Sequence, residues 1–159
     1  MNLNQGNLDA TVNKIVALGN VGIPSDPSID GIQDINRCLS KIISNRQALA
    51  EYSSLVLVRE GNLAVEEESL STEYKIHLDE LQLSDDKVKS GRNKEIRAAR
   101  AKTDPRSAEL RNKIIEVKKQ RSVYKSLQKV IDMTEANLKI AKESIGRMIA
   151  IIEVEFQNR

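Results

Sequence analysis

The feature that most constrains the fold of this chain is a repeat of seven residues that runs over residues 35–77. The series consists of Ile35, Ile42, Leu49, Val56, Leu63, Leu70 and His77, and six of these seven residues are apolar. A repeat sustained at this spacing is typical of a long α-helix that coils against another helix. We therefore predict one long helix over residues 32–83.

A second row of the same predicted helix also repeats every seven residues, but its composition changes along the chain. It is apolar at both ends and polar from Arg46 to Glu67. Because polar side chains do not fill a helix–helix core, this row predicts thin or wet packing in the middle of the helix.

A second long helix is predicted over residues 107–156. Asp104 suits the N-cap position, and Pro105 suits the first helical position. An apolar stripe then continues from Leu110 to Phe156. The break at Ser90-Gly91 favours a chain that folds back, so that the two long helices form a hairpin.

The N-terminal part of the chain has a different pattern. Residues 8–18 form a short amphipathic stretch, and Gly19 is the expected C-cap of this helix. A helix this short is marginal alone and must dock on its own chain or on a neighbouring subunit. Gly, Pro, Ser and Asp cluster in residues 19–31, which predicts a linker.

These patterns predict an all-α protein, a long helical hairpin or coiled coil with a short N-terminal helix. The expected segments are an N-terminal docking helix and linker (1–31), a long acidic helix (32–83), a basic connection (84–106) and a C-terminal assembly helix (107–159). Two helices alone cannot bury the whole of the apolar stripes of residues 32–83 and 107–156, so we expect a homo-oligomer. The expected oligomer core consists of Leu127, Ile131, Leu138, Ile145, Met148 and Ile152.

Charge is sorted by position along the chain. Residues 1–86 carry 6 basic and 14 acidic side chains, residues 87–129 carry 15 basic and 4 acidic ones, and residues 130–159 are nearly balanced. The net charge of +2 therefore hides a concentrated basic block. Such a block is typical of proteins that bind a polyanion, most often a nucleic acid.

The candidate nucleic-acid-binding residues lie at the start of this block. They are Lys87, Lys89, Arg92, Lys94, Arg97, Arg100, Lys102, Arg106, Arg111 and Lys113. Only Tyr124 could stack on bases, so phosphate contacts with little sequence preference are expected. The alternative is that the block pairs with the nine acidic residues of 60–86 in its own chain.

No combination of residues in the sequence indicates catalysis, a cofactor or a metal. The single histidine, His77, is expected to be a polar residue of the helix seam, and one Cys (Cys38) can form neither an intrachain disulfide nor a cysteine-based metal site. The phosphate-binding and dinucleotide-binding glycine motifs are missing. We predict a non-enzyme with no catalytic residues, no cofactor and no metal.

The N-terminus and the hydropathy of the chain bear on localisation. The first residues resemble no signal peptide, and no apolar run approaches the ~18 residues that span a bilayer. The expectation is a cytoplasmic protein without a membrane partner, in the host cytoplasm if a phage encodes it.

The segment Tyr124-Lys-Ser-Leu-Gln-Lys-Val-Ile-Asp-Met-Thr-Glu-Ala-Asn-Leu-Lys-Ile-Ala-Lys-Glu-Ser-Ile-Gly-Arg-Met-Ile-Ala is similar in layout to the end of UvsY-like phage recombination mediators. That family is also small and helical, with a basic middle before a C-terminal assembly helix. The resemblance implies that Arg97, Arg100 and Lys102 contact DNA and that residues 127–156 form the oligomer core.

The function expected from these observations is that of a non-enzymatic accessory protein. It would bind single-stranded DNA as an oligomer and organise it for recombination or replication, with a recombinase or another replication protein as its partner. The alternative is a coiled-coil structural or assembly protein, a scaffold or adaptor, that does not bind nucleic acid. A third reading is a DNA mimic or nuclease inhibitor that uses the acidic face.

Overall fold

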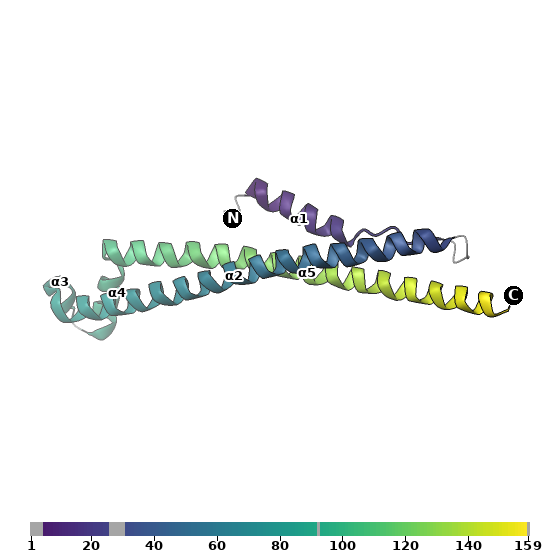
Figure 1. Cartoon of the computed structure of the whole chain (residues 1–159). Helices are drawn as coiled ribbons and strands as arrows, with labels where there is room; N and C mark the ends of the chain where they lie inside the picture. Colours follow the sequence, from purple (N-terminus) through teal and green to yellow (C-terminus); the bar gives the residue numbers. More distant parts are fainter. Residues whose placement is uncertain (1–4, 26–30, 92, 159) are drawn as a thin grey trace. The chain divides into compact units, whose positions relative to one another are not determined.

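The computed structural model of the chain describes residues 5–25, 31–91 and 93–158. Within them the chain is helical, without strands. The elements are α1 (Gln5–Gly19), α2 (Ile32–Ser84), α3 (Asp86–Lys89), α4 (Lys94–Lys102) and α5 (Pro105–Gln157) (Figure 1). Helices α2 and α5 pack together, which confirms the all-α helical hairpin.

The chain divides into two compact units. The first unit consists of Met1–Leu57 and Ser126–Arg159, and the second is Val58–Lys125. The first unit therefore contains α1, the beginning of α2 and the end of α5, whereas the second contains the rest of α2 and α5 together with α3 and α4. The candidate nucleic-acid interface belongs to the second unit.

The core of the first unit is built from residues on α2 and α5 that face each other. Its buried cluster consists of Ile35, Cys38, Ile42, Ala141, Ile145 and Ile152. Burial also raises the pKa of the Cys38 thiol. The predicted seven-residue series is buried from Ile35 to Leu63, while Leu70 and His77 are half-buried.

The residues expected to form an oligomer core pack within a single chain. Five of them are buried against the chain's own helices, and Met148 is partly buried against the α2–α5 cluster; the five are Leu127, Ile131, Leu138, Ile145 and Ile152. Their burial within one chain is what the structure shows, and their role in an oligomer core stays a prediction.

Helix α1 docks on its own unit. Ile15 of α1 is fully buried, and the side-chain amide of Asn45 on α2 donates a hydrogen bond to the carbonyl of Leu18 at 2.7 Å. Gly19 ends the helix as expected, but not by a left-handed conformation, because no described glycine has a positive φ. A Cβ at Gly19 would lie 3.2 Å from Thr134 Cγ2, so this glycine allows close packing instead.

The polar row of α2 makes polar contacts with α5. In the first unit, Arg46 pairs with Glu135, and Ser53 and Gln128 share hydrogen bonds of 3.2 and 3.4 Å. In the second unit, Glu60 pairs with Arg121. Each step of seven along α2 is matched by a step of seven back along α5, as in an antiparallel helix pair. The polar row is therefore part of the helix–helix contact, where we expected thin packing.

Gly146 lies in the interior of α5, and no close contact requires a glycine at this position. A Cβ at Gly146 would meet no heavy atom within 4 Å. Because glycine lowers helix stability relative to alanine, Gly146→Ala should raise the free energy of unfolding by about 0.5–1 kcal/mol. Urea denaturation measures this change, and an unchanged or lower stability would contradict it.

Candidate nucleic-acid interface

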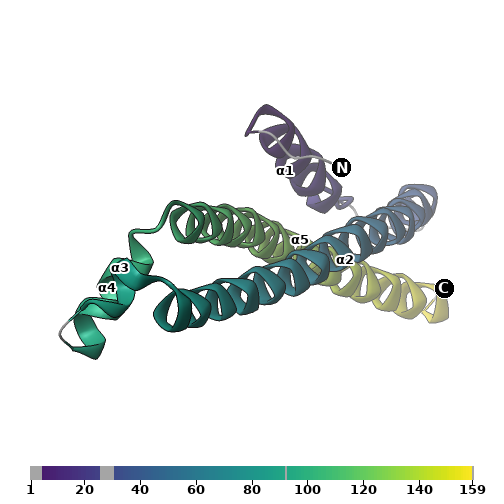
Figure 2. The same ribbon diagram turned by 90° about the vertical axis from the view of Figure 1, so that its left-hand side faces the viewer.

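Two short helices, α3 and α4, connect α2 to α5 within the second unit (Figure 2). Asp85 caps α3 by accepting hydrogen bonds from the backbone amides of Lys87 and Val88, and the side chain of Asn93 caps α4. Val88 of α3 and Ala101 of α4 are both buried. We call the cations of these two helices the basic tip: Lys87, Lys89, Lys94, Arg97, Arg100 and Lys102.

Gly91 allows the connection between α3 and α4 to pack closely on α4. A Cβ at this position would lie 2.8 Å from Cγ of Arg97 and 3.1 Å from its backbone nitrogen. The Nε atom of Arg97 is buried there and has no hydrogen-bond partner among the described residues. Any larger residue at position 91 must displace the first turn of α4, and with it this arginine.

Arg100 holds the two short helices together. Its Nη1 atom donates hydrogen bonds of 2.7 Å to the carbonyl of Lys87 and to Oγ of Ser90. These acceptors lie at the C-terminal end of α3, where unpaired carbonyls attract a positive charge. Arg100 therefore has a structural role in the tip, in addition to its contribution to the local charge.

Four lysines of the basic tip point into solvent. They are Lys87, Lys89, Lys94 and Lys102, and in the described part of the chain none of them forms an ion pair with a carboxylate. Arg92, the remaining candidate in this stretch, lies outside the described residues. The charge of these four lysines is therefore not neutralised by an ion pair within the described part of the chain.

The cations of α5 are in a different situation, because several are paired with acidic residues of α2. Nε of Arg121 contacts Glu60, and its Nη1 atom lies 3.1 Å from Glu67. Lys118 lies 3.8 Å from Glu67, and Lys125 lies 3.9 Å from Glu60. The two glutamates raise the pKa of Arg121, first through hydrogen bonds and then through their charge.

Two further candidate residues also have acidic partners. Arg106 lies 3.1 Å from Glu73 of α2, and Lys113 lies 2.7 Å from Glu109 one turn earlier on α5. The hydrogen bond between Lys113 and Glu109 raises the pKa of the lysine and lowers that of the glutamate. Arg111 forms no ion pair with any described residue.

The structure therefore pairs one part of the basic block with acidic residues and leaves another part without ion pairs among the described residues. Pairing with the acidic residues of 60–86 is found for Arg106 and for three cations that follow it on α5, whereas Lys113 pairs with Glu109 of its own helix. An unpaired cationic surface remains on α3 and α4 and at Arg111. The alternative prediction included Glu60 and Glu67 among the acidic partners of the block but did not pair them with Arg121, although their spacing of seven residues on one helix row was a usable signal.

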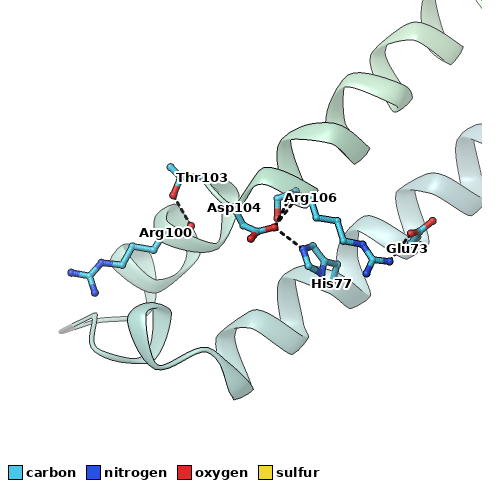
Figure 3. A network of polar contacts seen from close by, with 7 residues as sticks. Glu73, His77, Arg100, Thr103, Asp104 and Arg106 are labelled. Carbon is cyan, nitrogen blue, oxygen red and sulfur yellow. Dashed lines mark hydrogen bonds and ion pairs between the residues drawn. The ribbon is translucent and has the colours of Figure 1, made fainter.

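His77 connects the end of α2 to the beginning of α5 (Figure 3). Its Nε2 atom lies 2.9 Å from Oδ2 of Asp104, and the same oxygen accepts hydrogen bonds from the backbone amides of Arg106 and Ser107. Asp104 is therefore the predicted N-cap of α5. His77 is a polar residue of the helix seam, as expected, and its partner anchors the helix that follows the tip.

Acid should weaken the hydrogen bonds that Asp104 forms with His77 and with the backbone amides at the start of α5. The hydrogen bond with His77, followed by those with the amides of Ser107 and Arg106, lowers the pKa of Asp104. A lowered pKa stabilises the fold above the ordinary carboxyl pKa of about 3.9, and this stabilisation is lost as the pH falls through the lower folded-state value. Asp104→Asn keeps a good N-cap that does not titrate.

We therefore expect the wild-type chain to lose more stability than the Asp104→Asn chain between about pH 6 and pH 2. Urea denaturation midpoints measured across this range test the expectation. Parallel pH profiles for the two chains would contradict it.

The described residues contain neither a metal-ligand cluster nor a membrane-spanning helix. They contain no group of three or more His, Cys, Asp or Glu side chains that could hold a metal ion. No helix among them is long and apolar enough to cross a membrane. Comparison of the chain with protein families, curated proteins and solved structures found no match, so the function must be argued from the site itself.

Proposed function

We propose that this chain is a non-enzymatic, single-stranded-DNA-binding accessory protein that organises DNA for recombination or replication as an oligomer. One observation carries the proposal. Four solvent-exposed lysines gather on α3 and α4 without acidic partners in the described chain, while five of the cations of α5 are paired with glutamates. A surface of unpaired lysines is suited to phosphate groups.

The expected mode of binding follows from the residue types. Lysines contact phosphates as point charges, and Tyr124, the only aromatic ring of the basic block, is buried. Base stacking is therefore not expected to contribute, and affinity should depend steeply on salt with little sequence preference. An assembly would place several tips along one strand and multiply these weak contacts.

Two arginines of α5 separate a binding role from a structural role. Arg111 is exposed and unpaired among the described residues, whereas Arg121 bridges Glu60 and Glu67. Arg111→Ala should weaken binding to oligo-dT and leave the melting temperature unchanged. Arg121→Ala should lower the melting temperature, because it leaves two neighbouring glutamates without their shared partner.

Fluorescence anisotropy and thermal unfolding of both variants test this separation. The reverse pattern, or equal effects of the two substitutions on both measurements, would contradict the proposed division between unpaired cations that bind DNA and paired cations that stabilise the fold.

A second candidate function is that of a coiled-coil assembly protein without nucleic-acid binding. It is favoured by large apolar side chains that α2 and α5 expose, among them Val65, Met133 and Phe156, each about 70% exposed. A contiguous patch of such side chains would mark an interaction site. On this reading the tip variants would leave partner binding unchanged.

A further inference from the structure

The apolar faces that α2 and α5 bury both repeat every seven residues. The α2 series is buried from Ile35 to Leu63. The α5 series consists of buried side chains at the same spacing: Leu110, Val117, Tyr124, Ile131, Leu138, Ile145 and Ile152. If one helix slid along the other by seven residues, or about 10.5 Å, apolar side chains would again meet apolar side chains. These faces alone therefore distinguish poorly between the observed register and the shifted ones.

A second row on each helix carries polar residues at the same spacing. Three of these residues on α2 contact a residue of complementary character on α5. We call these contacts the polar layers: Arg46 with Glu135, Ser53 with Gln128, and Glu60 with Arg121. The first two layers belong to the first unit, and the third belongs to the second unit. Unlike the apolar faces, the polar layers differ from one position to the next, so they can distinguish between registers.

A shift of seven residues in one direction would put like charges together. Arg46 would move from Glu135 to Lys142, which carries the same charge as the arginine. Glu60 would then lie opposite the neutral Gln128. This register therefore has a repulsive contact where the observed one has an ion pair.

A shift in the other direction would separate the third layer. Glu60 would lie opposite Ile114, and Arg121 would lie opposite Ser53. The side chains of Arg121 and Glu60 are only 29% and 22% exposed, so both charges are largely removed from water. A charge in such a place costs free energy unless it is paired. Of the three registers, only the observed one gives every polar layer a complementary pair.

We propose that the polar layers fix the register in which α2 pairs with α5. Polar groups at a helix interface specify register at some cost in stability, because a mismatched pairing leaves them without partners. In the second unit, the register that joins Glu60 to Arg121 also brings His77 to Asp104. The inference goes beyond the proposed function and does not rest on it, because it concerns the pairing of helices and not the binding of DNA.

Pulsed electron paramagnetic resonance between two spin labels measures the register. The labels attach at Ile43→Cys on α2 and Lys129→Cys on α5, two exposed positions of the first unit, in a full-length parent chain that also carries Cys38→Ala. The contact of Arg46 with Glu135 places the labelled positions at different levels along the helix pair. A slip of seven residues therefore changes the distance between the labels. The parent chain should give a single distance.

A variant with apolar layers is the first test. Leucine replaces all six residues of the polar layers, so that no polar mismatch opposes a shift. This variant should remain helical by circular dichroism, melt at an equal or higher temperature and give two or more distances. A single distance equal to that of the parent would overturn the proposal and would show that the register is set elsewhere, for example by His77 and Asp104.

Charge reversal is a second test that adds no apolar surface. Arg46→Glu places a glutamate opposite Glu135 and favours the register in which position 46 lies opposite Lys142. This variant should therefore show an additional, longer distance. Adding Glu135→Arg should restore the single distance of the parent. Only the parent distance in Arg46→Glu, or no restoration by Glu135→Arg, would overturn the proposal.

Lys41→Glu is the matched control for the charge reversal. Lys41 is an exposed cation of α2 that forms no ion pair with a described residue. Its reversal should leave the single distance of the parent unchanged. All these distances are measured without DNA, so they stand or fall independently of binding to oligo-dT.

Discussion

Replacing Lys87, Lys89, Lys94 and Lys102 together by glutamine should weaken binding to single-stranded DNA by roughly 10²- to 10³-fold at about 0.1 M salt. Each phosphate contact to a single strand contributes about 0.7 to the slope of log K against log salt. Four lost contacts should therefore reduce the slope by about 3. Fluorescence anisotropy of labelled oligo-dT at several salt concentrations measures both quantities.

A second variant with the same change in charge is the control for this experiment. Lys41, Lys75, Lys139 and Lys142 are exposed lysines outside the tip and have no ion pair among the described residues. Their replacement by glutamine should have a much smaller effect on the affinity and the slope. Equal losses in both variants would show that net charge, and not the tip, governs binding.

Ile145→Ala should lower the free energy of unfolding by about 2–5 kcal/mol, the range for truncation of a fully buried isoleucine. Ile145 is 0% exposed and lies in the cluster that joins α2 to α5 in the first unit. The loss combines the transfer of apolar groups with the cavity that the missing atoms leave. Urea denaturation gives the value directly.

Ile43→Ala is the matched control, because Ile43 belongs to the same unit but points into solvent. It should change the free energy of unfolding by less than about 0.5 kcal/mol. If Ile145→Ala left the stability unchanged and altered only the mass of the assembly, the residue would belong to an interface between copies, as the apolar stripe alone suggested.

The hairpin could be predicted from the sequence because its determinants are local or periodic. The seven-residue series from Ile35 marks the face that α2 buries. The pair Asp104-Pro105 marks the start of α5, because a carboxylate satisfies free amides and proline needs none. Both signals are contained in a few neighbouring residues or in one helix.

The use of individual side chains could not be predicted in the same way, since it depends on the register between helices. Periodicity shows that Ile145 faces a helix but not whether that helix belongs to the same chain. It also places Glu60 and Arg121 on helix faces that pack against another helix, but it does not show that the two residues lie opposite each other. The seven-residue spacing fits many registers, and packing selects one.

The tip illustrates a third limit. In the sequence nothing distinguishes Arg100 from the other basic residues around it. In the structure its side chain forms hydrogen bonds that connect α4 to the end of α3. Gly91, which the sequence marks only as a break, is required by the close approach of Arg97. The contacts between α3, α4 and the residues that join them follow no periodic sequence pattern. They can therefore be seen only in the three-dimensional structure.

The central claim is that the unpaired lysines of α3 and α4 bind the phosphates of single-stranded DNA. The most direct measurement is an anisotropy titration of the wild-type chain with labelled oligo-dT and with a duplex of equal length, across salt concentrations. We predict tighter binding to the single strand and an affinity that falls steeply with salt, by several phosphate contacts per chain. Absence of binding to oligo-dT at low salt would contradict the account.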